Sequence, residues 1–171
     1  MKIAAITLAN GAAAFLRRNG DYLLMKRAPD RKIAPNVWSA VGGHMERDEL
    51  NDPKAACVRE IQEETGISAE QIRDLTLRYV IIRRHRDTIR QTYVYFGETD
   101  AEFIDKTDEG KLHWIPEREL TDRPYTSTFA AMLRHYMATP NIERVIVGVA
   151  ENNGGACQMV WAALEDFDVE A

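Results

Sequence analysis

The stretch that decides the fold runs from Gly42 to Ile67 and reads GGHMERDELNDPKAACVREIQEETGI. Its second half has the two ends of a helix. Asp52 can accept hydrogen bonds from the free amides of a first turn, and Pro53 fits the first helical position, where no donor is needed. Gly66 can take the left-handed conformation that ends many helices. The stretch therefore predicts a helix between Asp52 and Gly66.

Three carboxylates project together from this helix. At about 100° per residue, Glu60, Glu63 and Glu64 form one cluster, and the apolar residues fall on a separate side. Two like charges about 4 Å apart repel by roughly 4 kcal/mol at an effective dielectric near 20, but by only about 1 kcal/mol in water. The three glutamates alone therefore fit a solvated acidic face. An enclosed face would need a cation, and hard divalent ions such as Mg²⁺ take carboxylate oxygens.

The double glycine before the helix favours the metal site. Gly42 and Gly43 let the backbone pass close to the helix, where a carbonyl can face the same ion. The stretch resembles the Nudix box, in which Gly and Glu are separated by five residues, and seven more precede Arg-Glu-aliphatic-any-Glu-Glu-any-Gly-aliphatic. Nine positions match in type, namely Gly43, Glu49, Arg59, Glu60, Ile61, Glu63, Glu64, Gly66 and Ile67. One departure is the nine residues from Leu50 to Val58 that separate Glu49 from Arg59. Two extra residues at a loop-to-helix junction cost little.

The resemblance implies an α/β fold, a Nudix-type α/β/α sandwich with a mixed β-sheet between helices. The 171 residues suit one domain with a real core. We expect that domain to span residues 1–171, with the core over about 3–138 and a C-terminal β-hairpin extension over about 141–168. This hairpin is similar to an extension in the branch of the family that sanitises oxidised purine nucleotides.

Periodicity and turn residues predict the elements. Ile3 to Arg18 is expected to form one or two strands, with a break at Asn10-Gly11, and Asn19-Gly20 is a strong hairpin turn. A short helix is expected over Ser68–Leu75, and the second well-defined helix over Ser127–Met137. The remaining strands are expected at Tyr22–Arg27, Val37–Val41, Leu77–Arg83, Gln91–Glu98, Lys111–Ile115, Glu143–Val149 and Gln158–Leu164.

The resemblance also implies the metal chemistry. It makes Glu63 and Glu64 the main ligands of Mg²⁺, with Mn²⁺ as the alternative ion, and the Gly42 carbonyl a supporting ligand. Glu60 is either a third ligand or the base that activates the water. Arg59 is expected to orient the neighbouring glutamates.

Other site residues lie outside the box. Family members often add an acidic residue from a later loop, and within the predicted loop Asp105–Gly110 the first candidate is Glu109 and the second is Asp108. Lys26 and Arg27, at a strand end, either touch the substrate phosphates or are simply solvated.

Two residues before the double glycine are candidates for the substrate pocket. Trp38 is either a core residue, which is favoured, or a ring that lines the substrate pocket. Ser39 is a candidate for reading a base edge. The basic run from Arg83 to Arg90 either leans over a polyphosphate or forms a solvated hairpin tip, and the tip is favoured.

The resemblance implies hydrolysis of a nucleoside diphosphate linked to another moiety. A nucleoside triphosphate, including a modified one, would give the monophosphate and pyrophosphate. Alternatives are an ADP-ribose or dinucleotide pyrophosphatase, and a non-catalytic nucleotide-sensing module, although such modules usually lose box glutamates. A prenyl-diphosphate-type isomerase would need a pocket cysteine. The oxidised-purine branch reads the base with an acidic pair near the second helix, and residues 123–127 lack that pair.

Composition narrows the partners. A net charge of −5 and a pI of about 5.4 argue against a grip on duplex nucleic acid, and leave a small-molecule nucleotide as the expected partner. No run approaches the ~20 apolar residues of a membrane span. The weakly signal-like N-terminus is interrupted by Thr7 and Asn10, and Cys57 and Cys157 fit no disulfide or zinc pattern. We therefore expect a cytoplasmic protein, and the sequence gives no oligomeric state.

Overall fold

The computed structural model describes residues 5–31, 34–103, 107, 109–140 and 143–166. In this part of the chain, nine strands form one mixed sheet. The strands are β1 (Thr7–Arg18), β2 (Asp21–Arg27), β3 (Trp38–Ser39), β4 (Val41–His44), β5 (Arg73–His85), β6 (Thr88–Glu98), β7 (Gly110–Pro116), β8 (Ile146–Asn153) and β9 (Ala156–Ala163). The helices are α1 (Pro53–Thr65) and α2 (Ser127–Ala138), with 3₁₀ turns η1 (Arg47–Glu49), η2 (Ala69–Gln71) and η3 (Glu117–Asp122).

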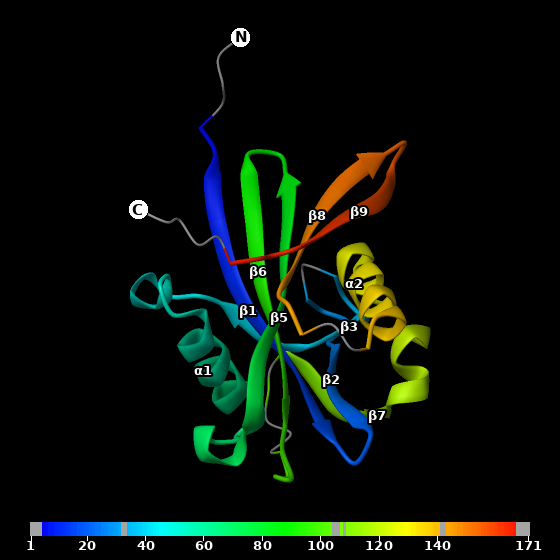
Figure 1. The fold of residues 1–171 in the computed structure, drawn as a ribbon. Helices are drawn as coiled ribbons and strands as arrows, with labels where there is room; N and C mark the ends of the chain where they lie inside the picture. The colour runs from blue at the N-terminus through cyan, green and yellow to red at the C-terminus, as the bar shows by residue number, and fades with distance from the viewer. Residues whose placement is uncertain (1–4, 32–33, 104–106, 108, 141–142, 167–171) are drawn as a thin grey trace.

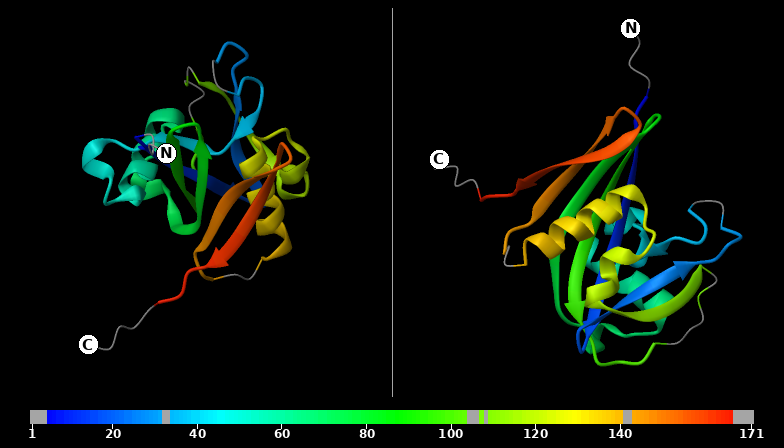
Figure 2. Two further views of the ribbon diagram at one scale, coloured as in Figure 1. Left: turned by 90° about the horizontal axis from the view of Figure 1, so that it is seen from above. Right: turned by 90° about the vertical axis from the view of Figure 1, so that its right-hand side faces the viewer.

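The sheet is organised around β1. The strand order is β3-β2-β1-β6-β5-β8-β9, with β4 also paired to β1 and β7 to β2. β1 runs parallel to β6, and β5 runs parallel to β8, whereas the other pairs are antiparallel. Helices α1 and α2 lie on opposite faces of the sheet, and α2 crosses its face beside the β8–β9 hairpin (Figures 1 and 2). This arrangement confirms the predicted α/β/α sandwich.

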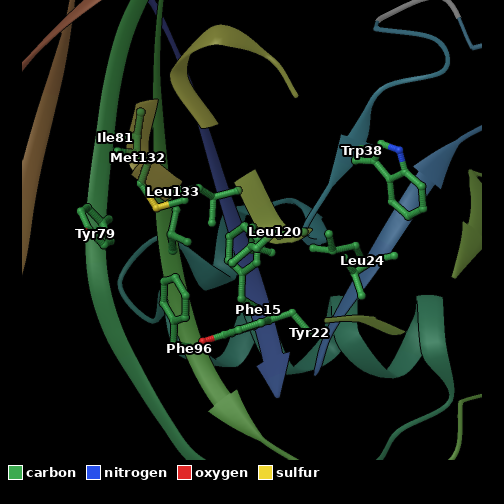
Figure 3. Close-up of a cluster of buried hydrophobic side chains, with 14 of the residues drawn as sticks. Phe15, Tyr22, Leu24, Trp38, Tyr79, Ile81, Phe96, Leu120, Met132 and Leu133 are labelled. Carbon is green, nitrogen blue, oxygen red and sulfur yellow. The ribbon is translucent and has the colours of Figure 1, made fainter. Parts of the chain in front are cut away.

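Alternation along β1 builds a core on each face. Ala12 and Leu16 belong to a buried cluster with Ile61 of α1. Phe15, which points the other way, belongs to the cluster that includes Met132 of α2 (Figure 3). Since successive side chains of a strand point to opposite faces, one strand supplies both cores.

Local chemistry sets the ends of α1 as predicted. Asp52 Oδ1 accepts a hydrogen bond from the Ala55 amide at 3.0 Å, and Pro53 opens the helix. Gly66 has φ 74°, and its amide donates to the Gln62 carbonyl at 2.9 Å. In α2, Met132 and Leu133 are fully buried.

Two predicted local features were wrong. β1 continues through Asn10-Gly11 without a break. A Cβ on Gly11 would lie 2.8 Å from the Gly43 carbonyl oxygen, so this glycine allows β4 to approach closely. The helix expected from Ser68 is only the turn η2, because β5 already begins at Arg73.

The predicted Asn19-Gly20 turn is present, and a second glycine turn joins the last two strands. Asn19 and Gly20 both have positive φ, at 51° and 89°, between β1 and β2. Gly154 and Gly155, with φ of 61° and 92°, connect β8 to β9. Neither α-helix in the described part of the chain has the length and apolarity needed to cross a bilayer.

Candidate active site

The site begins where β4 crosses α1. The Gly42 amide donates a hydrogen bond to Glu64 Oε2 at 2.8 Å, and the Glu64 side chain is buried. Burial is the main reason that the pKa of Glu64 rises to about 8, and the negative charges of Glu109 and Glu60 act in the same direction. The Gly42 amide and the charge of Arg27 oppose the rise. The hydrogen bond from Gly42 and the charge of Arg27 are therefore too weak to offset the cost of ionising the buried Glu64 carboxylate.

Glu60 lies against the backbone of Gly43, the second residue of the double glycine. A Cβ on Gly43 would be 2.5 Å from Glu60 Oε2, so a side chain at this position would displace the carboxylate. Burial raises the pKa of Glu60, and the charges of Glu63 and Glu109 add to this rise, whereas Arg59 opposes it. The two glycines therefore have distinct tasks, since Gly42 binds Glu64 through its amide and Gly43 leaves room for Glu60.

Arg59 connects the parts of the box. Its Nε and Nη2 donate to the two carboxylate oxygens of Glu49 at 2.7 and 2.9 Å, and Nη2 also donates to the His44 carbonyl at 3.0 Å. Its Nη1 donates to Glu60 and Glu63, each at 3.0 Å. The residues inserted after Glu49 thus leave its contact with Arg59 intact, and these hydrogen bonds lower the pKa of Glu49 to about 2.

The predicted metal ligands are only partly assembled. Glu63 is turned toward Arg59 and its side chain is 59% exposed. Across the described residues, no three His, Cys, Asp or Glu side chains already form a metal site. The contact seen for Gly42 uses its amide, and coordination by its carbonyl stays a prediction. The donor set nevertheless fits a hard divalent cation, because buried carboxylates with raised pKa values are stabilised by a nearby positive charge.

The loop before β7 brings a further carboxylate to this region. Glu109 Oε2 accepts from Arg27 Nη1 at 3.3 Å, and Oε1 accepts from Arg31 Nη2 at 2.6 Å. The charge of Glu109 raises the pKa of both Glu60 and Glu64, which places it in the same electrostatic environment. Sequence reasoning missed Arg31, because nothing in its loop signals a partner 78 residues away. The reserve candidate Asp108 lies outside the described residues.

The predicted substrate residues lie on the paired strands β2 and β3. Lys26 is exposed on β2 and pairs with Trp38. Trp38 is buried in the α2-side core (Figure 3), as the favoured interpretation expected. Its ring centroid lies 5.2 Å from that of His113. The Arg123 guanidinium lies 5.3 Å from the Trp38 ring centroid. Ser39 is half-buried beside it.

Two further observations bear on the chemistry. Arg90 Nη1 donates to His44 Nε2 at 3.2 Å, a contact that sequence reasoning missed.

Cys57 is fully buried in the α1-side core, where burial raises the pKa of its thiol to about 12. A thiol with this pKa is a poor nucleophile, so Cys57 offers no support for the isomerase alternative.

Comparison with known protein families matches residues 7–136 to the NUDIX domain. The chain therefore belongs to the Nudix family. It is 28% identical over 151 residues to a Mycobacterium tuberculosis protein called putative 8-oxo-dGTP diphosphatase 3, covering 78% of this chain and 68% of that protein. The family match, together with this diphosphatase relative, supports a Nudix pyrophosphohydrolase, a hydrolase that acts on diphosphate linkages.

Solved structures show the same fold. The MutT protein from Bacillus halodurans aligns with a TM-score of 0.67 at 18% identity, over 90% of this chain and 97% of that one. An Ap4A hydrolase from Caenorhabditis elegans aligns with a TM-score of 0.59 at 17% identity, over 79% and 98% of the two chains. At these identities the likeness concerns the fold alone.

Proposed function

We propose that this chain is a Mg²⁺-dependent hydrolase of a nucleoside diphosphate linked to another moiety. Its substrate is a nucleoside triphosphate, natural or modified, and its products are the monophosphate and pyrophosphate. The observation that carries the proposal is Glu64, a buried carboxylate with a pKa of about 8 that is bound by the Gly42 amide and surrounded by the charges of Glu60 and Glu109. Such a cluster suits a divalent cation and a substrate that brings phosphates to it.

The residues of the box would hold a divalent ion and orient the groups around it. A bound divalent ion offsets the charge of the diphosphate oxygens and lowers the pKa of a water molecule. Glu64 and Glu63 would be the main ligands of this ion once the Glu63 carboxylate turns from Arg59, with the Gly42 carbonyl as a supporting ligand. Glu60 would be either a third ligand or the base that takes the proton from water. Arg59 already donates to several partners at once, so it acts as a positioning residue.

Basic groups near the box would bind the phosphates. Arg27 lies beside Glu109, and its Nε is buried with no hydrogen-bond partner in the described part of the chain. That donor suits a phosphate oxygen, and Lys26 is exposed on the same strand. Ser39, which follows the buried Trp38, would contact the base. The free thiols of Cys57 and Cys157 fit a reducing, cytoplasmic setting.

Substitution of Glu64 tests the reaction. Glu64→Gln should abolish Mg²⁺-dependent turnover while the protein stays folded, because the amide keeps the shape and removes the charge. Glu151→Gln is the matched control, since Glu151 is exposed on β8 and should tolerate the same change. Circular dichroism and the release of monophosphate and pyrophosphate would be measured on both variants. Turnover retained in Glu64→Gln would remove the assignment.

A substrate screen tests the specificity. Nucleoside di- and triphosphates, oxidised purine nucleotides, ADP-ribose and dinucleotides would be incubated with Mg²⁺ or Mn²⁺, and the products identified by mass. We expect a nucleoside triphosphate to give the monophosphate and pyrophosphate. Preferred cleavage of ADP-ribose or a dinucleotide would reassign the substrate. Binding without any product would identify a sensing module.

A further inference from the structure

The basic residues of the β5–β6 hairpin separate into two groups. Residues 83–90 contain four arginines and one histidine but only one acid. Arg84 serves the turn, because its Nε donates to the Arg86 carbonyl at 2.8 Å. Arg83 and Arg90 lie away from the turn, as directly opposed residues of the antiparallel pair. This hairpin stands at one end of the sheet, beside the start of β1 (Figure 1).

Strand alternation places Arg83 and Arg90 on the α2 side of the sheet. Tyr79 and Ile81 of β5 belong to the core on that side, and Arg83 follows at the same two-residue spacing. Val94 of β6 belongs to the same core, and Arg90 precedes it at even spacing. Arg84 therefore projects from the opposite face.

Arg90 connects this pair to the Nudix box. Its Nη1 donates to Nε2 of His44, the last residue of β4. Gly42, whose amide binds Glu64, lies two positions earlier on the same strand. Arg90 therefore lies beside the last residue of the box strand, and Arg83, which is exposed to solvent, lies directly opposite Arg90 on β5.

The pair carries an unbalanced charge. Like charges directly opposite each other destabilise an antiparallel pair. The ion pairs found between described residues involve neither Arg83 nor Arg90. Burial lowers the pKa of Arg83, and the charge of Arg90 lowers it further. An anion between the two guanidinium groups would remove this repulsion and accept charge-assisted hydrogen bonds from both.

We propose that Arg83 and Arg90 form a phosphate-binding subsite on the α2 side of the sheet. It receives a phosphate of the substrate other than the two that flank the cleaved linkage. The assignment rests on the proposed function, because it takes the box as the place of cleavage. The phosphate has two sources, namely the terminal group of a 5′-triphosphate or a group on the sugar.

Binding without metal tests the subsite. The full chain, in EDTA so that no turnover occurs, would be titrated by calorimetry with dGDP, dGTP and dGDP bearing an additional 3′-phosphate. We expect one of the last two ligands to bind about 10-fold more tightly than dGDP, as a hydrogen bond to a charged group provides. A preference for dGTP identifies the terminal phosphate, and a preference for the 3′-phosphorylated ligand identifies the sugar phosphate.

Three variants make the test specific. Arg83→Gln and Arg90→Gln should each remove most of this preference, whereas Arg84→Gln, with the same charge change on the opposite face, should keep it. The subsite is overturned if the wild type has no preference, if the first two variants keep it, or if Arg84→Gln loses as much. Mg²⁺-dependent hydrolysis is measured separately. A protein that binds as expected but hydrolyses no nucleotide would overturn the proposed function and leave the subsite standing.

Discussion

Glu64 is held in a place that disfavours its own charge. The residue is only 8% exposed and accepts a hydrogen bond from the Gly42 amide, while the charges of Glu60 and Glu109 act against ionisation. A neutral residue would avoid this penalty. A cation bound beside Glu64 would offset this penalty. Without the cation, the raised pKa of Glu64 should make the stability of the protein depend on pH, whether or not the protein turns over a substrate.

The stability of the metal-free protein should fall as the pH rises. Glu64 has an ordinary pKa of 4.5 when unfolded and about 8 when folded, so above pH 4.5 the unfolded state loses a proton that the folded state keeps. The free energy of unfolding should therefore decrease between about pH 4.5 and 8, by an amount that Glu64→Gln removes. Urea unfolding in EDTA at several pH values measures this.

Two comparisons complete that experiment. Glu60 has its pKa shifted in the same direction, so Glu64→Gln should keep a smaller slope. Added Mg²⁺ should stabilise the wild type at pH 8 and have much less effect on Glu64→Gln. Equal slopes for the two proteins in EDTA would show that Glu64 ionises normally in the folded state.

At the scale of elements, Arg59 ties α1 to β4 and η1. It reaches Glu49 on η1 and the His44 carbonyl on β4, while it also holds Glu60 and Glu63 on its own helix. The guanidinium suits this task because its donors have a fixed planar arrangement. This one side chain therefore joins the three elements and orients Glu49, Glu60 and Glu63.

Arg59→Lys should therefore impair catalysis more than folding. A lysine cannot reproduce the forked contact with Glu49 while it also reaches Glu60 and the His44 carbonyl. Loss of such a supporting contact typically weakens metal affinity or activity about 10- to 100-fold. A Mg²⁺ titration of turnover should show this, with the unfolding midpoint nearly unchanged. Arg73→Lys, in the exposed pair with Asp100, is the matched control. If both variants lose the same activity, the contacts of Arg59 have no special role.

The sequence predicted elements well where local chemistry decides them. Asp52 and Gly66 set the ends of α1, and the Asn-Gly pair at Asn19 sets the first hairpin. It failed at Gly11, where crowding from β4 decides and no local signal exists. It also could not tell which glutamate of the helix face is buried, because Arg59 draws Glu63 outward.

Contacts in the site between residues far apart in the sequence could not be predicted either. Glu109 was chosen from its loop and does carry a charge that acts on Glu60 and Glu64, but its partner Arg31 had no signal. The contact between Arg90 and His44 joins residues 46 positions apart. Such pairs depend on the strand order, which places β6 and β4 on the two edges of β1. Periodicity along the chain contains no information on that order.

At the scale of the whole molecule, the β8–β9 hairpin lies beyond the residues that match the family, yet it is packed on the core. The Trp161 ring centroid lies 4.6 Å from His135 of α2 and 5.8 Å from Tyr79 of β5. A Cβ on Gly148 would be 2.2 Å from the Trp161 ring, so this glycine makes room for it. We infer that residues 1–171 form a single domain in which the hairpin and the core unfold together.

Trp161→Ala tests this coupling. Removal of a large packed side chain should lower the free energy of unfolding by about 3 kcal/mol. Val160→Ala is the control, because Val160 is the preceding residue, faces the other way and is 47% exposed. It should change the stability by under about 1 kcal/mol. Urea unfolding would be followed by circular dichroism and by the fluorescence of Trp38 and Trp114, which report on the core. If the hairpin is part of the domain, both signals shift to the same lower midpoint in Trp161→Ala. An unchanged fluorescence midpoint would mean that the core is indifferent to the hairpin, and that the last two strands are an independent extension.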